Sequence, residues 1–182
     1  MNWQIYKDPT AMIPPSEYDR LFSQEKALKP RDILFVKRGS YRIGSVAMVS
    51  PNDINVVLTR EILVLRLSTQ MALERYGLTP EYLLYAMSHL LTYKQLENKI
   101  FIDTTLPNIA HRWKELKIPI PNDAHVLKNI TQKVQNTIAK QWGFLESIDA
   151  LKTMMGCFTL DQNKGFSHLD RLCLHLRREA RG

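Results

Sequence analysis

A single apolar stripe runs through the last third of this 182-residue chain. Its hydrophobic residues recur at spacings of three and four, or their sum, which predicts one face of a long helix: Leu127, Ile130, Val134, Ile138, Leu145, Ile148, Leu151 and Met155. A helix of this length cannot bury its whole face against a small sheet. We therefore predict a projecting helix from about Asp123 that needs a partner. Packing within the chain is the alternative, and Gly143 weakens the expectation of a continuous rod.

Upstream of the stripe, strand and helix patterns fall in separate blocks. Two aliphatic runs, at residues 33–36 and 43–49, predict strands joined by a hairpin-like turn over residues 38–42. Further strand is predicted at residues 56–58 and 61–67. Because strands and helices do not alternate, we expect a small antiparallel meander rather than a parallel sheet.

Helical signals dominate after Gly77. Thr79 is a good N-cap and Pro80 suits the first helical position, so a helix is expected from there to about Tyr93, with KQLENK extending or restarting it. A strand at residues 100–103, a polar loop, a short helix near 109–115 and a strand ending in two prolines should follow. The predicted fold class is α+β: a small, twisted, mostly antiparallel sheet with flanking helices, then a long helical spacer. The predicted domains are residues 1–122 and residues 123–182, the second with a basic tail.

Composition limits the classes of function. The net charge is +7 and the pI about 9.5, which favours a polyanionic partner, chiefly nucleic acid. Residues 26–42 alone carry six basic side chains and one acid, a local net charge of +5. No apolar run approaches the ~20 residues of a membrane span, and the N-terminus lacks the layout of a secretory signal. We therefore expect a soluble, cytoplasmic protein without a membrane partner.

Motifs of catalysis and metal binding are missing. The seven glycines are scattered, so no glycine cluster opens a helix to cradle a phosphate, and no arrangement of nucleophile and base is recognisable. The expectation is a non-catalytic chain with no cofactor of its own. A zinc site would have to use Cys157, His168, Cys173 and His175, whose spacing matches no common zinc pattern, so two reduced thiols are the preferred interpretation.

Two stretches, DILFVKRGSYRIGSVAMVS and TTLPNIAHRWKELKIPIP, carry a resemblance to a known family. The chain resembles the target recognition domain of type I restriction-modification specificity subunits, in the form associated with N6-adenine DNA methylases. The likeness covers roughly residues 2–155. It rests on a strand opened by an acid, a glycine-bracketed basic turn, a helix with the P-x-Y-L pattern, an I-P-x-P exit and a long helix: Asp32, Gly39, Gly44, Pro80, Tyr82, Leu83, Ile118, Pro119, Pro121 and residues from Asp123.

The resemblance implies a DNA-binding specificity module. Its expected partners are double-stranded DNA, an adenine methylase subunit that holds the S-adenosylmethionine, and a restriction subunit as an optional addition. Relatives carry a basic strand before the Asn2–Trp3 pair, so a first strand is expected to be missing here, which would expose a sheet edge. One recognition domain and one spacer, where a full subunit has two of each, imply a homodimer through residues 123–155 or dependence on the methylase.

The resemblance also assigns candidate contacts with DNA. The turn offers Lys37, Arg38, Ser40, Tyr41 and Arg42, where glycines permit close approach, the cations meet phosphates, and Arg38 or Arg42 reads guanine. The second set comprises Thr104, Thr105, Asn108, His111, Arg112 and Lys114, and Arg60 is a weaker candidate apart from both sets. The ordinary alternatives are a solvated hairpin for the turn, and helix capping for Thr104 and Asn108.

Two other functions stay open. The chain would be an assembly module that docks a methylase without binding DNA, or the C-terminal fragment of an N6-adenine DNA methyltransferase.

Overall fold

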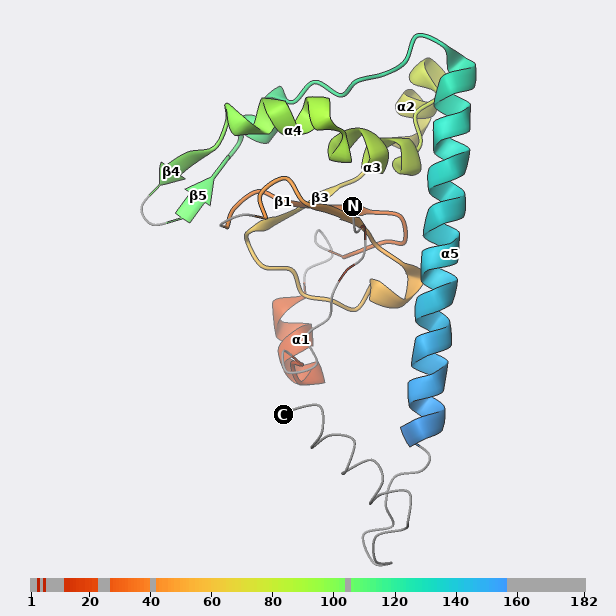
Figure 1. The fold of residues 1–182 in the computed structure, drawn as a ribbon. Coiled ribbons are helices and arrows are strands. Elements are labelled where there is room, and N and C mark those ends of the chain that lie inside the picture. Colours follow the sequence, from red (N-terminus) through yellow and green to blue (C-terminus); the bar gives the residue numbers. More distant parts are fainter. Residues whose placement is uncertain are drawn as a thin grey trace, which may run out of the picture. The chain divides into compact units, whose positions relative to one another are not determined.

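The computed structural model describes residues 3, 5, 12–22, 27–39, 42–103 and 106–156. It confirms the α+β class. A three-stranded and a two-stranded antiparallel sheet are accompanied by helices and followed by a long C-terminal helix (Figure 1). The helices are α1 (Pro15–Leu21), α2 (Thr69–Tyr76), α3 (Pro80–Ser88), α4 (Leu90–Glu97) and α5 (Ala124–Gly156), with short 3-10 helices η2 (Pro51–Asp53) and η3 (Arg112–Glu115). The strands are β1 (Ile33–Val36), β2 (Val46–Met48), β3 (Ile62–Leu65), β4 (Phe101–Asp103) and β5 (Leu106–Asn108).

The larger sheet has the order β2-β1-β3, with β1 in the middle and both neighbours antiparallel to it. Phe35 lies opposite Val46 on one side and Leu63 on the other. Ile33, Leu34 and Phe35 are all buried, although successive side chains of a strand point to opposite faces. Both faces of β1 are therefore covered, which explains why its sequence is a continuous apolar run rather than an alternating one.

One face of this sheet packs on a cluster of aliphatic side chains. Leu28, Leu34 and Val49 are its buried members, and Ile62 and Val64 of β3 pack against them. α3 packs against β2, and Leu96 of α4 lies against Gly44. A Cβ at Gly44 would stand 2.6 Å from Leu96 Cδ1, and its φ of +88° also favours glycine. The outer edge of β2 is partly paired, because the Met48 N–H donates to the Trp3 carbonyl at 3.2 Å.

The helix expected from Pro80 to about Tyr93 is two helices. Its start is as predicted, since the Thr79 hydroxyl accepts from the Tyr82 N–H at 3.2 Å. It ends at Ser88, and His89 is extended, with ψ of 146°. His89 caps α4 through Nδ1, which accepts from the Leu91 N–H at 3.2 Å. Of KQLENK, residues 94–97 belong to this restarted helix, which ends at Glu97 with Asn98 as its C-cap.

Other local predictions need correction. Strand is limited to residues 46–48 and 62–65 where longer strands were expected, residues 56–58 are not strand, and no strand forms at residues 116–121. The expected loop before residue 109 holds β5, and the expected helix near 109–115 is only the 3-10 helix η3. α2 was not predicted at all.

Two buried carboxylates are each held by an arginine. Asp32 is 3% exposed and accepts from Arg66 Nε at 2.6 Å and from the Lys29 N–H at 2.7 Å. Glu81, 4% exposed, accepts from Arg31 Nε at 2.8 Å and from Arg31 Nη2 at 2.7 Å. These pairs connect the start of β1 with the segment after β3 and with the first turn of α3. The planar guanidinium suits both, because it donates two parallel hydrogen bonds to one carboxylate.

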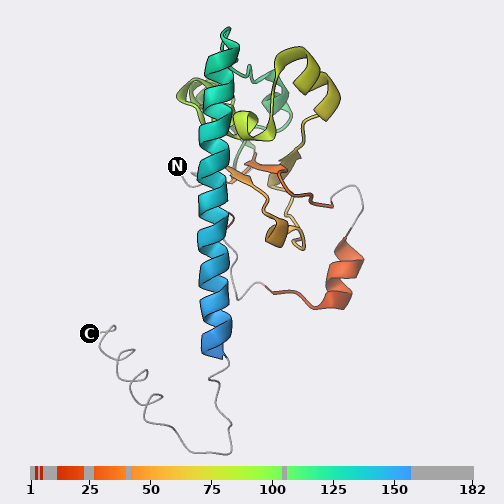
Figure 2. The ribbon, with the colours of Figure 1, turned by 90° about the vertical axis from the view of Figure 1, so that its right-hand side faces the viewer.

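α5 is one uninterrupted helix through Gly143 (Figure 2). The structure divides into compact units at residues 1–140 and 141–182, so α5 belongs to both. In the first unit, Leu127 is buried in a cluster with Tyr82 and Ala86 of α3, and Val134 and Ile138 are buried too. Packing within the chain, the alternative to a partner, therefore accounts for the first part of the stripe.

Burial raises the pKa of Tyr82 above its ordinary value of 10.0, with a further contribution from Tyr85. The ring is 2% exposed and its hydroxyl donates to the Pro119 carbonyl at 2.6 Å. Below pH 10 the phenol is neutral in the folded and the unfolded chain, so its contribution to stability is complete. As the pH rises through 10 the unfolded chain ionises first, and this contribution is lost.

Urea unfolding of the wild type and of Tyr82→Phe, each at pH 8 and pH 11, would test this pH dependence. At pH 8 the variant should be less stable by about 1 kcal/mol, since it lacks the hydrogen bond. At pH 11 the difference should shrink by up to about 1 kcal/mol, because only the wild type loses stability through this group. A difference that is constant with pH would contradict the prediction.

Candidate nucleic-acid interface

The two sets of residues predicted to contact DNA meet at the backbone of Lys37. The Lys37 N–H donates to the Glu61 carbonyl at 2.8 Å, and its own carbonyl accepts from the Ile109 N–H at 3.1 Å. The Gly39 N–H donates to the Pro107 carbonyl at 3.2 Å, so Arg38 and Asn108 form an antiparallel bridge. The chain beyond β1 thus leaves β3 and joins β5. We call the surface formed by Lys37, Arg38, Arg42, Arg60 and Asn108 the basic corner.

Arg38 is the most constrained cation of the basic corner. Directly bridged residues of an antiparallel pair share a face, so its side chain lies on the same face as Asn108. Its Nε is buried and has no hydrogen-bond partner within the described part of the chain. A buried donor of this kind costs stability, about 1–3 kcal/mol in typical cases. The residue after it, Gly39, has a φ of +128°, a conformation that favours glycine.

Glu61 places a negative charge inside the basic corner. Its pKa is lowered first by a hydrogen bond from the Thr59 hydroxyl, then by its own backbone N–H, and further by the charges of Arg38 and Lys37. It is therefore ionised at neutral pH. Its charge reduces the attraction of the corner for a polyanion, which the count of basic residues along the sequence did not reveal.

The net charge of +5 over residues 26–42 also overstates what is available. Arg31 is engaged with Glu81, and Lys26 lies outside the described residues. Arg42 and Arg60 are exposed. Lys29 is exposed as well, while Lys37 and Arg38 are half-buried. The cations of residues 26–42 that reach solvent are therefore Lys29, Arg42 and, in part, Lys37 and Arg38.

The remaining predicted contacts vary in their setting. The Asn108 Oδ1 accepts from the Ala110 N–H at 2.8 Å, so this side chain shapes the turn before η3, where Ala110 has a φ of 42°. Asn108 does not cap η3, whose N-cap is His111, so the capping alternative is wrong for this residue, and its Oδ1 is engaged in the turn instead. His111 and Lys114 are exposed, and Lys114 Nζ lies 5.9 Å from the centre of the Trp113 ring. Ser40, Tyr41, Thr104 and Thr105 lie outside the described residues.

Arg112 is committed to contacts within the chain. Its Nη1 donates to the Lys99 carbonyl at 3.4 Å, and its Nε lies 3.5 Å from the Glu115 carboxylate. Glu115 also accepts from Lys99 Nζ at 2.7 Å, and this contact is the main reason that the pKa of Glu115 is lowered. Arg112 is therefore a weaker candidate for a phosphate contact than the cations of the basic corner.

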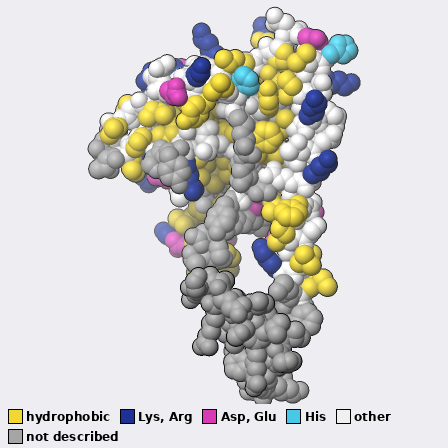
Figure 3. All heavy atoms as spheres, viewed as in Figure 1, with side chains coloured by type: hydrophobic (Ala, Val, Ile, Leu, Met, Phe, Trp, Pro, Cys, Tyr) yellow, Lys and Arg dark blue, Asp and Glu magenta, His cyan; other side chains and the backbone are white. Residues whose placement is uncertain are grey.

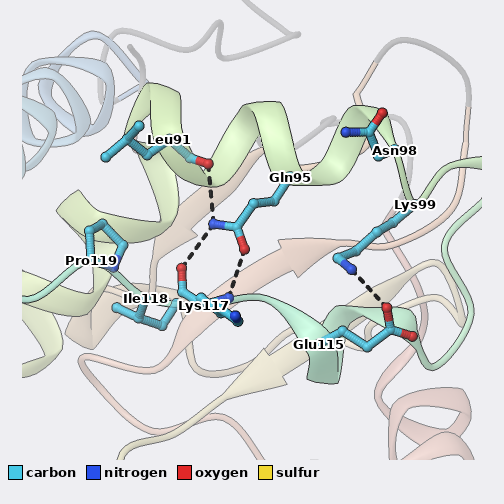
Figure 4. A pocket seen from close by; sticks show the side chains of 8 residues that line it. All are labelled: Leu91, Gln95, Asn98, Lys99, Glu115, Lys117, Ile118 and Pro119. Atoms are coloured by element: carbon cyan, nitrogen blue, oxygen red, sulfur yellow. Dashed lines mark hydrogen bonds and ion pairs between the residues drawn. The ribbon is translucent and has the colours of Figure 1, made fainter.

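An open recess of about 610 Å³ lies between α4 and residues 115–119 (Figure 4). The polar groups around it are engaged with each other. The Gln95 amide donates to the Lys117 carbonyl at 2.9 Å and accepts from the Lys117 N–H at 2.9 Å, while Lys99 pairs with Glu115. The recess therefore offers apolar surface, from Leu91, Ile118 and Pro119, rather than reactive groups.

Sequence reasoning missed a pair of apolar residues beside the basic corner. Ile102 of β4 is 74% exposed and Leu106 of β5 is 41% exposed. The register pairs Asp103 with Leu106, so the strands are joined by two residues. Short apolar runs on either side of a two-residue link are a hairpin signal, but Thr104–Thr105 is not one of the usual turn pairs, such as Asn-Gly.

The described residues form neither a clustered metal site nor a membrane-spanning helix. In that part of the chain, no group of three or more His, Cys, Asp or Glu side chains is placed to hold a metal. The cysteines and histidines considered for zinc lie outside it. None of its helices has the length and apolar character needed to span a bilayer.

Comparisons with protein-family models, with curated proteins and with solved structures found no match. Function is therefore inferred from the residues and their geometry.

Proposed function

We propose that this chain is the sequence-specific DNA-binding module of a type I restriction-modification system. It would hold an adenine methylase, and in a complete system a restriction subunit, over a defined site. The observation that carries this proposal is the joining of residues 37–39 to residues 107–109. This pairing brings together two segments that resemble parts of the recognition domain and lie about seventy residues apart in the sequence, and the first of them is basic.

Methyl transfer would be carried out by the partner methylase. S-adenosylmethionine belongs to the methylase, and this chain contributes position and specificity. The second part of α5 supports a protein partner, because Phe144, Leu151 and Met154 are 63%, 58% and 64% exposed. An apolar face of this kind on one helix suits docking on another helix, either of the methylase or of a second copy of this chain.

The exposed face of α5 also favours the second candidate function, an assembly module without DNA binding. A salt titration separates the two. We expect the affinity of the wild type for a labelled random-sequence duplex, measured by fluorescence anisotropy, to fall linearly in log–log form between about 50 and 200 mM salt. A chain with no salt-dependent affinity would be the assembly module instead.

The basic corner is tested by the double variant Arg38→Gln/Arg42→Gln. Each lost phosphate contact should make the salt slope shallower by about 0.9, and the pair should weaken binding about tenfold at moderate salt. The matched control is Lys128→Gln/Lys133→Gln, which removes the same charge from exposed positions on α5. Equal losses in the two variants would show that net charge alone drives binding and would remove the role of the corner.

Glu61→Gln gives a prediction of the opposite sign. It removes the negative charge beside Lys37 and Arg38, so affinity for the random duplex should rise about two- to threefold at low salt. The gain should disappear at high salt, because screening shortens the range of the interaction. Unchanged affinity at low salt would place the duplex away from this residue.

A further inference from the structure

β4 and β5 form a two-stranded ribbon that is attached to the rest of the chain at its base. Phe101 pairs with Asn108, Ile102 with Pro107 and Asp103 with Leu106. The attachment runs through β5, whose end is hydrogen-bonded to residues 37–39. Figure 1 shows the ribbon extending away from the larger sheet, beyond α4. The end of the ribbon that carries Leu106 therefore points away from the basic corner.

Apolar side chains are exposed on both faces of this ribbon. Paired residues share a face, so Ile102 and Pro107 lie on one face, and Phe101, Asn108 and Leu106 lie on the other. Ile102 is 74% exposed, while Phe101 and Leu106 are 38% and 41% exposed. Figure 3 shows hydrophobic side chains gathered over the ribbon and α4. A two-stranded ribbon is only marginally stable in water by itself, so its most exposed apolar face, the one with Ile102, is the face on which a partner is expected.

We infer that the β4–β5 ribbon enters the major groove of the DNA duplex, and that Ile102 determines specificity by contact with base edges. This inference rests on the proposed function. The major groove is about 12 Å wide and admits a two-stranded ribbon, whose strands lie about 4.8 Å apart, with its side chains on both faces. A ribbon that lies there turns one face to the base edges on the groove floor, and Ile102 is the most exposed apolar side chain of the ribbon.

The positive charge at the base of the ribbon favours a DNA duplex over an apolar protein as the partner. Lys37 and Arg38 lie where β5 joins the chain beyond β1, so they meet the phosphates that border the groove. Arg38 shares the face of Asn108, which is opposite to that of Ile102, so we assign Arg38 to the phosphates and Ile102 to the base edges. Phosphate contacts fix the position of the ribbon, and apolar contact with thymine methyl groups supplies the discrimination.

The experiment compares Ile102→Ser with Leu90→Ser, a matched change at an exposed leucine of α4, which is 59% exposed. A duplex selected by the wild-type chain from a random pool is titrated beside a random duplex. Ile102→Ser should lower the ratio of the two affinities by about fivefold or more, with the salt slope and the affinity for random DNA unchanged. Leu90→Ser should leave the ratio at the wild-type value.

Two modified duplexes identify the groove. Uracil in place of thymine removes only a major-groove methyl group, and inosine in place of guanine removes only a minor-groove amino group. The uracil duplex should bind the wild type more weakly and Ile102→Ser equally well, and inosine should have no effect.

An unchanged ratio in Ile102→Ser, or a response to inosine instead of uracil, would overturn the inference while salt-dependent binding preserved the proposed function. If the wild type binds no duplex, the proposed function and the inference both fall.

Discussion

Replacing Phe35 with alanine is expected to lower the free energy of unfolding by about 3–5 kcal/mol. Phe35 is fully buried in the central strand, and its paired neighbours Val46 and Leu63 lie on either side. The substitution removes a large apolar side chain and leaves a cavity that a strand held on both edges cannot collapse to fill. Since a domain of this size is stable by about 5–15 kcal/mol in total, much of the population would unfold at moderate urea concentrations.

The measurement is urea unfolding followed by circular dichroism, with Phe22→Ala as the matched control. Phe22 follows α1, stacks on Tyr18 and is 42% exposed. The same chemical change there should cost less than about 1 kcal/mol, since a large part of this residue already faces water and no buried cavity is left. Comparable losses in both variants would show that β1 is not the centre of the core.

Arg66→Met is expected to lower the free energy of unfolding by about 2–3 kcal/mol. The methionine keeps most of the apolar volume of the arginine stem, so the main loss is the partner of a buried charge. Asp32 is 3% exposed and would retain only its backbone donor, the Lys29 N–H. The expected cost lies at or below the lower end of the usual 3–5 kcal/mol for fully buried pairs, because the Arg66 side chain is 43% exposed.

A double-mutant cycle separates the lost partner from other effects. Asp32→Asn alone should cost less than Arg66→Met, because the arginine can return to solvent. Adding Asp32→Asn to Arg66→Met should recover part of the lost stability, since a neutral amide replaces the unpaired carboxylate. A double variant that is less stable than Arg66→Met would show that the carboxylate is not the source of the penalty.

Strands with a buried, aliphatic sequence were predictable, and those whose pairing depends on distant residues were not. Residues 33–36 form a strand as expected because their run of apolar residues fits a position covered on both faces. β5 contains Pro107 and has little strand propensity of its own. It exists because β4 and the chain after β1 both pair with it. Local pattern cannot reveal such a pairing.

The break between α3 and α4 has a similar cause. No glycine or proline stands at Ser88 or His89, so the sequence there looks continuously helical. The Ser88 hydroxyl accepts from the indole N–H of Trp3 at 2.8 Å, a contact between residues far apart in the chain. The Ala86 carbonyl at the break accepts from the His89 N–H at 3.2 Å and from the Thr92 hydroxyl at 2.7 Å.

Part of the candidate site was predictable because its signal is local in the sequence. Glycine and charge mark the turn after β1 in any fold, so Lys37, Arg38 and Arg42 stand out directly. The negative charge of Glu61 and the exposed Ile102 do not, because their importance comes only from what the backbone places beside them.

The join at Lys37 uses only the peptide N–H and carbonyl. Any amino acid except proline supplies both groups, so these hydrogen bonds do not depend on the side chain at position 37. The Pro107 carbonyl across the junction is also a group that any residue supplies, whereas position 39, with its φ of +128°, favours glycine. Substitutions at such positions can change the side chains offered to a ligand while the fold stays the same. A family of proteins that share one fold could acquire different ligands in this way.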